Sequence, residues 1–467
     1  MNPYRNQLDS YIDAHQREFV EALSRLIAQA SPAGEAKPGM PFGEGPDGAM
    51  KEALKVAEEW GFPTRNYDGY VGLVDLNSQP DQLHILAHMD VVAAGSGWDT
   101  DPYQMVERDG VLYGRGVADD KGPALAALLA MRAVKESGIP LAKNVKLLLG
   151  TDEESGSSDI AYYYGREPYA PNTISPDAEF PVINIEKGHY HPEFTRSWAV
   201  ETALPRVAEL TGGIRLNVVP PEASALVLGL DSGRVRELTN AQNGTGVTFD
   251  VTDVEGGVRI DAHGVNAHAS TPDEGRNAIT ALLDRLAKLP LAGCESTAAI
   301  KALHTLFPHG DNGGKALGIA QSDPESGALT LAFSLFTLDA NGCKGQFDAR
   351  VNLTGTEENC KSPAERAFAA QGFQASGEMS PPHVVPANDP FVQTLLDCYT
   401  GHTGREGKCL AIGGGTYVHS IPGGVAYGAC ELDFDCRMHG ANERVPLEML
   451  ITCAKIYADA IVRICGA

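Results

Sequence analysis

Four short segments of the chain place a histidine or acidic side chains next to runs of residues that resemble buried strands. In the first, His88 and Asp90 follow the apolar run 83–87. Residues two apart in a strand lie on the same side, so the Asp90 carboxylate can hold one ring nitrogen of His88. Such a contact fixes the tautomer and orientation of a metal-binding imidazole. Alone, this short pattern is more typical of two ordinary polar residues at the end of a surface strand.

The second segment, 114–123, carries the adjacent acids Asp119 and Asp120 at the start of a predicted helix whose first turn contains Pro123. Acids in this position often cap a helix, and for the segment alone capping is the commoner explanation. The Gly-x-Gly at 114–116 also invites a dinucleotide-binding interpretation. We reject it because Asp119 stands where the third glycine of that motif would be.

The other two segments contribute three more acids. Glu153 and Glu154 follow the apolar run 145–149, and Asp177 precedes the run 182–185. Two adjacent glutamates can divide the labour, one binding a cation and the other acting as general base on a cation-bound water. A solvated acidic turn describes the two glutamates equally well, and an ordinary turn aspartate is the commoner explanation of Asp177.

The four segments together are stronger evidence for a functional site than each is alone. Each lies at the end of a predicted buried strand or at the start of the helix that follows it. Ligands of open α/β sheets bind outside the carboxyl ends of the strands. Three carboxylates and a histidine gathered there would repel strongly without a counter-charge, which a pair of divalent cations supplies. We therefore expect a metal site at this edge of the sheet.

The pattern of apolar residues predicts an α/β fold built from two domains. Early in the chain, strands alternate with long helices, which indicates a doubly wound, mostly parallel sheet with helices on both faces. After residue 187 the strands become half-buried and alternating, which indicates an antiparallel sheet. We predict a catalytic domain of residues 1–187 and 383–467 and an inserted α+β lid domain of residues 188–382. The predicted helices include 5–30, 47–60, 123–135 and 277–289, the predicted strands include 83–87, 145–149, 182–185 and 258–262, and a hairpin turn is expected at Asn341-Gly342.

Composition excludes several classes of partner. The 467 residues include 61 acidic and 37 basic side chains, and a net charge of −24 disfavours nucleic acid and anionic membranes. Charged residues interrupt the first 30 positions, so no secretory segment is expected there. The nine cysteines all follow residue 293 and form no C-x-x-C pair. We expect a soluble, cytoplasmic protein that spans no membrane.

Several longer motifs occur in a characteristic order: 95–98, 114–123, 150–156, 177–181 and 413–417. Through them the chain resembles the dinuclear metallopeptidases, a family that includes aminoacylase, carboxypeptidase G, succinyl-diaminopimelate desuccinylase and the PepV-type dipeptidases. The resemblance runs through most of the chain and is strongest to the PepV-type members.

The resemblance implies two divalent cations per chain, with zinc favoured and manganese or cobalt as alternatives. His88 and Asp177 would bind one cation, and Glu154 and His439 would bind the other. Asp119 would bridge the two. Family members also place a cis peptide bond directly after the bridging carboxylate.

The same resemblance implies roles for residues that do not bind the cations. Glu153 would be the general base that deprotonates the attacking water and then protonates the leaving amine, while Asp90 orients His88. His268, within the motif 267–272 of the inserted domain, would donate a hydrogen bond to the tetrahedral oxyanion. The C-terminal carboxylate of the substrate would be held by Asn217, Arg350, Gly414 and Gly415.

These implications predict a metallodipeptidase that hydrolyses short peptides with a free C-terminal carboxylate. Because the inserted domain is long, we expect a monomer. The alternatives are an N-acyl amino acid deacylase with the same metals and base, or a non-catalytic binding protein on the same fold. His189 and His191 form a His-x-His pair just past the domain boundary, and we interpret them as part of a surface hinge without a role.

Overall fold

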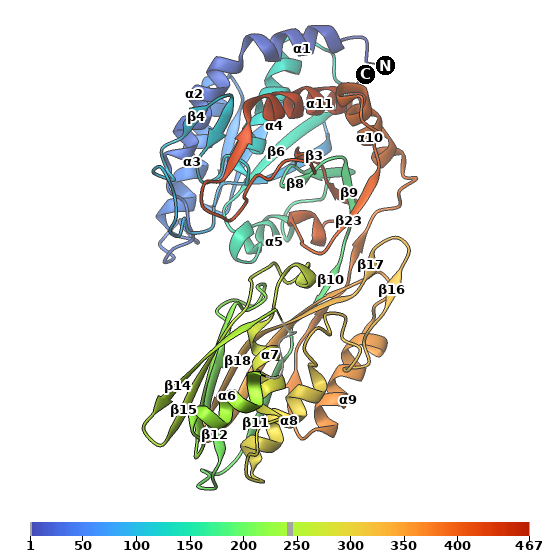
Figure 1. The fold of residues 1–467 in the computed structure, drawn as a ribbon. Helices are drawn as coiled ribbons and strands as arrows, with labels where there is room; N and C mark the ends of the chain where they lie inside the picture. The colour runs from blue at the N-terminus through green and yellow to red at the C-terminus, as the bar shows by residue number, and fades with distance from the viewer. Residues whose placement is uncertain (1, 241–245, 467) are drawn as a thin grey trace. The chain divides into compact units, whose positions relative to one another are not determined.

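The computed structural model describes residues 2–240 and 246–466 and divides into two compact units. The first unit combines Met1–Ile185, Val384–Leu410 and Gly415–Ala467, and the second combines Glu186–His383 and Ala411–Gly414. The chain therefore leaves the first unit after its early strands and returns to complete it (Figure 1).

The first unit is built on a nine-stranded mixed sheet in the order β1-β2-β6-β3-β7-β24-β9-β22, with β23 paired to β9. Its central strands β6, β3, β7 and β24 run parallel, and the β1–β2, β2–β6 and β24–β9 pairs are antiparallel. This sheet and its helices confirm the predicted fold class. The strands are β1 (Thr64–Tyr67), β2 (Val71–Asp75), β3 (Asp81–His88), β6 (Asn144–Gly150), β7 (Asn172–Ser175), β9 (Val182–Glu186), β22 (His383–Val384), β23 (Cys409–Ile412) and β24 (Gly424–Ala426).

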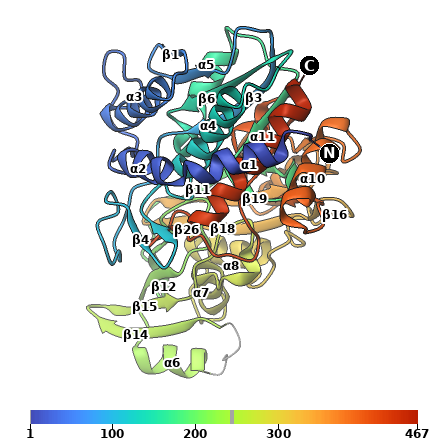
Figure 2. The ribbon, with the colours of Figure 1, turned by 90° about the horizontal axis from the view of Figure 1, so that it is seen from above.

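Strand β3 is buried on both faces, as expected for a strand in the middle of an α/β sheet. Ile85 and Ala87 belong to the core that also contains α4 and α11, whereas Leu86 packs with Ile160 of α5 and Tyr417 of η4. Figures 1 and 2 show α1, α4 and α11 grouped together in this unit. The helices are α1 (Arg5–Ala14), α2 (Gln16–Ile27), α3 (Glu44–Glu59), α4 (Lys121–Glu136), α5 (Ser158–Tyr164), α10 (Pro390–Thr403) and α11 (Leu447–Cys465), with short turns η1 (Glu153–Ser155) and η4 (Tyr417–Ser420).

The predicted helix over 5–30 is instead two helices that meet at His15. The His15 ring nitrogen Nδ1 lies 2.7 Å from the Tyr11 carbonyl oxygen, and the His15 amide donates to Ile12. A side chain that takes the carbonyl of the preceding turn competes with the helical hydrogen bond, which explains the break.

Two small ribbons attach the C-terminal segment to the first unit. In one, β26 (Arg444–Pro446) pairs antiparallel with β5 (Val111–Tyr113), which also pairs with β4 (Val106–Arg108). In the other, β25 (Ala429–Cys430) runs parallel to β8 (Ala178–Glu179). The ribbons therefore bring residues near 440 beside two early segments that carry predicted metal ligands.

The second unit is built on a ten-stranded antiparallel sheet in the order β14-β15-β13-β12-β18-β19-β10-β21, with β11 joining β19 to β20. Its core lies between this sheet and helices α7, α8 and α9. The predicted hairpin joins β18 to β19, where Asp339 pairs with Gly342. The strands are β10 (Gly188–Tyr190), β11 (Glu193–Ser197), β12 (Arg206–Gly212), β13 (Glu222–Leu228), β14 (Thr248–Val254), β15 (Gly257–His263), β16 (Ser322–Asp323), β17 (Gly327–Ala328), β18 (Thr330–Asp339), β19 (Gly342–Val351), β20 (Gln374–Ser376) and β21 (Met379–Ser380). The helices are α6 (Ser232–Asn240), α7 (Ala278–Leu286), α8 (Glu295–Leu306) and α9 (Ser362–Ala370), with the turns η2 (Pro272–Glu274) and η3 (Glu357–Lys361).

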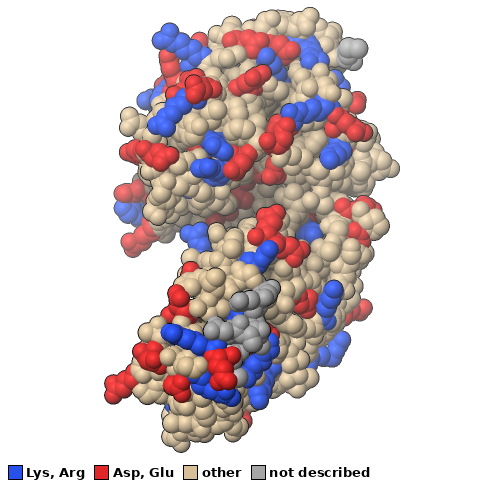
Figure 3. All heavy atoms as spheres, in the orientation of Figure 1, with Lys and Arg blue, Asp and Glu red and all other residues tan. Residues whose placement is uncertain are grey.

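Charged side chains of both signs are interspersed over the face seen in Figure 3. The net negative charge is therefore not gathered into one block on this face. Within residues 2–240 and 246–466, each helix is too short or too polar to cross a bilayer.

A buried carboxylate on α11 gives this unit a pH-dependent contribution to stability. Asp459 is 2% exposed, accepts a hydrogen bond from Arg463 Nε at 3.0 Å, and lies 3.6 Å from His402 Nε2. Burial alone would raise the pKa of Asp459, but His402 and Arg463 outweigh it and lower the pKa from 3.8 to about 2. A lowered pKa stabilises the fold above the unfolded-state value, and this stabilisation is lost as pH falls from about 4 to about 2.

We therefore expect Asp459→Asn to lower the free energy of unfolding by about 2 kcal/mol at pH 7 and by about half as much near pH 3. Urea unfolding of the variant and the wild type at both pH values measures this difference. A destabilisation of equal size at pH 7 and pH 3 would show that the charge of Asp459 is not the cause.

Candidate metal centre

The predicted ligands converge because three neighbouring strands of the first unit end together. Strand β3 ends at His88 and is parallel to β6 and β7, with His88 paired to Gly150 at the end of β6. The glutamates of η1 follow β6 directly, and Asp177 follows β7 by two residues. Parallel strands present their carboxyl ends at one edge, so these side chains meet there.

Asp119 lies between two histidines. Its Oδ1 is 3.0 Å from His88 Nε2, and its Oδ2 is 2.9 Å from His439 Nε2. Asp177 Oδ2 lies 3.6 Å from His88 Nε2, and Glu154 Oε2 lies 3.2 Å from His439 Nε2. Two ligands of one tetrahedral ion, each about 2.1 Å from it, lie about 3.4 Å apart. The spacing therefore suits a carboxylate that offers one oxygen to each of two ions.

The ligand atoms form two groups, each with its members within 4.8 Å of one another. The two adjacent glutamates fall in different groups. Asp119, Glu154 and His439 form one group, and His88 and Asp177 belong to the other. The third member of that other group is Glu153, whose carboxylate the sequence analysis assigned to proton transfer.

Asp90 contacts members of both groups. Its carboxylate oxygens accept hydrogen bonds from the backbone amides of Glu153 at 3.2 Å and Glu154 at 3.0 Å. His88 Nδ1 lies 3.0 Å from the Asp90 carbonyl oxygen and 3.4 Å from Asp90 Oδ1. Asp90 therefore contacts the histidine and also fixes the backbone of the glutamate turn.

The crowded carboxylates perturb one another. Burial and the neighbouring Asp119 raise the pKa of Asp177 to about 7, and burial followed by Asp177 raises the pKa of Glu153 well above its usual value. Hydrogen bonds with Asp119 and Glu154 raise the pKa of His439 to about 11. Without metal, protons on these groups balance the negative charge. Binding of two cations must therefore displace protons.

The peptide bond between Asp119 and Asp120 is cis, which agrees with the expectation from the family resemblance. The Asp120 carboxylate accepts the backbone amide of His88 at 3.1 Å. Of the two adjacent acids, only Asp119 belongs to a candidate ligand group among the described residues.

The remaining predicted site residues, except Gly415, belong to the second unit. Asn217 and His268 lie on adjoining segments, because the Asn217 carbonyl accepts the amide of Ala269 and Val218 forms a bridge with His268. His268 Nδ1 lies 2.6 Å from Ser270 Oγ.

Arg350 of β19 is 5% exposed and firmly held. Its Nε and one terminal nitrogen each donate to Asp348 at 2.7 Å, and its other terminal nitrogen donates to the Gly413 carbonyl at 2.6 Å. The last nitrogen also lies 3.1 Å from His189 Nε2, and His191 Nε2 lies 3.0 Å from Asp348. His189 and His191, for which no role was predicted, therefore both belong to this network. Asp348 was not among the predicted site residues. Its position two residues before Arg350 in a strand could have indicated it, because such residues lie on the same side of the strand.

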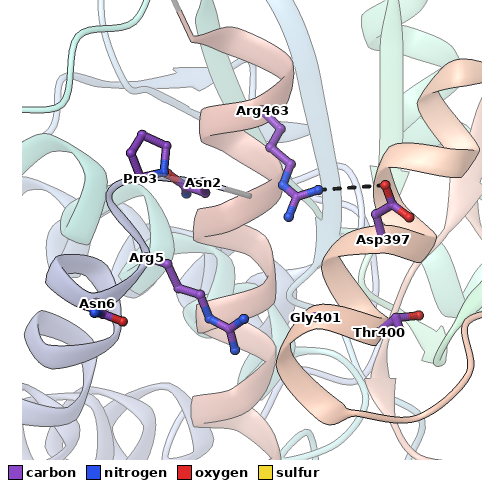
Figure 4. A pocket seen from close by; sticks show the side chains of 8 residues that line it. All are labelled: Asn2, Pro3, Arg5, Asn6, Asp397, Thr400, Gly401 and Arg463. Carbon is purple, nitrogen blue, oxygen red and sulfur yellow. Dashed lines mark ion pairs between the residues drawn. The ribbon is translucent and has the colours of Figure 1, made fainter.

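A surface pocket of the first unit lies apart from this chemistry. Figure 4 shows its lining, which includes Arg5, Asp397 and Arg463, with Arg463 4.0 Å from Asp397. None of its lining residues belongs to either ligand group.

Comparison with known proteins supports the same assignment of fold and chemistry. A family model described as peptidase family M20/M25/M40 matches residues 84–463. The chain is 35% identical over 459 residues to the Beta-Ala-Xaa dipeptidase of Lactobacillus delbrueckii subsp. lactis, covering 96% of each protein. It is 33% identical over 436 residues to the putative dipeptidase YtjP of Bacillus subtilis, covering 91% of this chain and 92% of that protein.

Solved structures show the same fold at low sequence identity. Human carnosine dipeptidase 1 superposes with a TM-score of 0.61 at 17% identity, covering 99% of each chain. The dipeptidase Dug1p of Saccharomyces cerevisiae gives a TM-score of 0.59 at 14% identity, covering 99% of this chain and 98% of that one.

Proposed function

Because this chain belongs to peptidase family M20/M25/M40, we propose that it is a metal-dependent dipeptidase acting on short peptides with a free C-terminal carboxylate. The observation that carries the proposal is the position of Asp119, whose two oxygens face His88 and His439 separately. The names of the two sequence relatives supply the substrate class.

The donor set fits a pair of divalent cations, for which zinc is the first candidate and manganese or cobalt the alternatives. His88 and Asp177 would hold one ion, Glu154 and His439 the other, and Asp119 both. When bound, such ions polarise a scissile carbonyl and lower the pKa of water.

Glu153 is the proposed general base. It takes a proton from the attacking water and delivers it to the leaving amine, which a carboxylate of raised pKa does well near neutral pH. Asp90 holds the Glu153 amide and thereby the position of this side chain. His268 would donate a hydrogen bond to the oxyanion that develops on the substrate.

The substrate carboxylate would be held by Arg350 and Asn217, with the backbone groups of Gly414 and Gly415. Arg350 is prepared for this role because Asp348 fixes the plane of its guanidinium with two hydrogen bonds. A guanidinium fixed in this way loses little further freedom when it binds a carboxylate.

The monomeric state and the cytoplasmic location expected from the sequence stay predictions.

Purified protein should be tested with Co²⁺ or Zn²⁺ against matched pairs of substrates, a free dipeptide (including a β-alanyl dipeptide) and its N-acetylated counterpart. We expect kcat/KM to be at least about 100-fold higher for the free dipeptides, because a polar site discriminates strongly against an altered polar group. Hydrolysis of the N-acetylated compounds with no activity on free dipeptides would instead identify a deacylase. A protein that hydrolyses neither and holds no divalent metal would be a binding protein.

Arg350→Lys tests the proposed recognition of the carboxylate. Lysine keeps the charge beside Asp348 but loses the planar fork, so kcat/KM for dipeptides should fall by about 10- to 100-fold. The corresponding dipeptide amides, which lack the carboxylate, should lose much less. Lys344→Met on the same strand is the matched control, because Lys344 pairs with Glu193 at 2.5 Å and is exposed. Equal losses for acids and amides would contradict this role of Arg350.

A further inference from the structure

Two charged side chains outside the ligand groups are buried beside them. Arg115 is 1% exposed and Glu443 is 0% exposed, and Arg115 donates from one terminal nitrogen to Glu443 Oε2 at 2.6 Å. They come from segments more than 300 residues apart in the sequence. Burying an ion pair is unfavourable unless its remaining atoms are also hydrogen-bonded, so the partners of those atoms indicate what the pair does.

The second oxygen of Glu443 organises the backbone that leads to Asp119. Glu443 Oε1 accepts hydrogen bonds from the amides of Gly116 at 3.0 Å, Ala118 at 2.9 Å and Asp119 at 3.2 Å. Several backbone amides that point at one anion form a rigid concave turn. The position of the Asp119 side chain therefore depends on the Glu443 carboxylate.

The second terminal nitrogen of Arg115 holds the loop that carries His439. It donates to the carbonyl oxygens of His439 at 3.2 Å and Gly440 at 3.1 Å. His439 has a φ of +63°, a left-handed conformation that is unfavourable for a residue with a side chain. The guanidinium group also lies 5.3 Å from the centre of the Trp98 ring. Arg115 thus stabilises an unfavourable backbone conformation at a candidate ligand.

One ion pair therefore positions two members of the same ligand group. Asp119 and His439 belong with Glu154, whereas the group of His88, Glu153 and Asp177 contains none of the residues that contact Arg115 or Glu443. This inference rests on the proposed function. We propose that Arg115 and Glu443 are positioning residues that align Asp119 with His439 and so mainly set the affinity for the cation that Glu154 and His439 would hold.

The backbone alone keeps the two segments close. Strand β26 pairs with β5, with Arg444 opposite Tyr113, and the Gly114 amide donates to the Glu443 carbonyl. Conservative changes to the two side chains should therefore leave the fold intact while loosening the ligands. Arg115→Lys keeps the charge but cannot span the carboxylate and both carbonyls, and Glu443→Gln keeps the shape but loses the charge.

The experiment titrates metal-free protein with Co²⁺ and follows heat and the visible absorption of the bound ion, so that the two binding events are separated. We expect Arg115→Lys and Glu443→Gln each to weaken the ion that Glu154 and His439 would hold by about 10- to 100-fold. The ion that His88 and Asp177 would hold shares only Asp119 with the pair, so it should be weakened by a clearly smaller factor. The matched controls are Arg463→Lys and Asp459→Asn, which alter a partly buried arginine–aspartate pair of the same unit. Both controls should bind two ions as the wild type does.

Wild-type affinity for both ions in the two folded variants would overturn the proposal. Equal weakening of both ions, or loss of the fold in the absence of metal, would also overturn it, because the pair would then be purely structural. These outcomes differ from those that would refute the proposed function. A wild type that binds two Co²⁺ ions but cleaves no dipeptide would refute the dipeptidase alone. A wild type that cleaves dipeptides but binds no second ion would refute the positioning role alone.

Discussion

Replacing Glu153 with glutamine should lower kcat for dipeptides by about 10³-fold while leaving two divalent ions bound to each chain. Glutamine has nearly the shape of glutamate but cannot carry the proton from the attacking water to the leaving amine. The Asp90 carboxylate would still hold the backbone amide at position 153, so the loop should stay in place. Steady-state kinetics together with the metal content of the same sample measure both effects.

The same variant decides between two roles that the geometry permits. Glu153 lies with His88 and Asp177 in one ligand group, so its carboxylate could bind an ion instead of moving a proton. If the variant loses one ion in parallel with activity, Glu153 is a ligand and the proposed base is wrong. Asp152→Asn is the matched control, because Asp152 accepts from Ser158 and belongs to neither group. Its activity should fall by less than about tenfold.

The second large effect is expected for Asp119→Asn. Asparagine offers one carbonyl oxygen, whereas the aspartate directs one oxygen to His88 and the other to His439. A bridging ligand cannot be replaced by a group with a single acceptor. We therefore expect bound metal to fall from two ions per chain to one or fewer and kcat/KM to fall by about 10³-fold or more. Elemental analysis after dialysis and dipeptide kinetics give the two values.

Asp120→Asn is the matched control for this prediction. Burial, followed by the Asp177 carboxylate, raises the pKa of Asp120 well above its usual value, so removing its charge costs less here than at an ordinary aspartate. Asparagine can still accept the His88 amide through its own oxygen. This variant should retain both ions. Two bound ions and unchanged turnover in Asp119→Asn would contradict the bridging role.

The convergence of His88, Glu153 and Glu154 was predictable from the sequence because each residue follows a predicted apolar strand. Asp177 was expected only as a residue before the run 182–185, and the strand that it follows, β7, was not predicted. Strands β6, β3 and β7 are neighbours and parallel, so local patterns at their ends translate directly into proximity. The mostly parallel sheet and the inserted antiparallel sheet were predictable for the same reason, since periodicity distinguishes strands buried on two faces from strands buried on one.

The position of His439 could not be predicted from local patterns. It lies 262 residues beyond Asp177, and it reaches the site through the short ribbons β5–β26 and β8–β25. Strands of two or three residues leave no periodic signal, so only the family resemblance suggested this histidine. Arg115 lies in the motif 114–123 and Glu443 lies four residues beyond His439. Their pairing depends on the same ribbons.

The break at His15 and the network around Arg350 show a second limit. Both depend on side chains that bind backbone carbonyls or charged partners in other elements, such as Arg350 on Gly413. Hydropathy patterns contain no information about such contacts. Sequence reasoning therefore located the buried strands better than it located the hydrogen bonds that orient the side chains.

The central claim is that two ions share Asp119, and anomalous diffraction from crystals grown with Zn²⁺ and collected at the zinc edge tests it most directly. We predict two peaks about 3.5–4 Å apart, both in contact with Asp119. One should also contact His88 and Asp177, and the other His439 and Glu154. A single peak, or zinc bound without Asp119, would contradict the account.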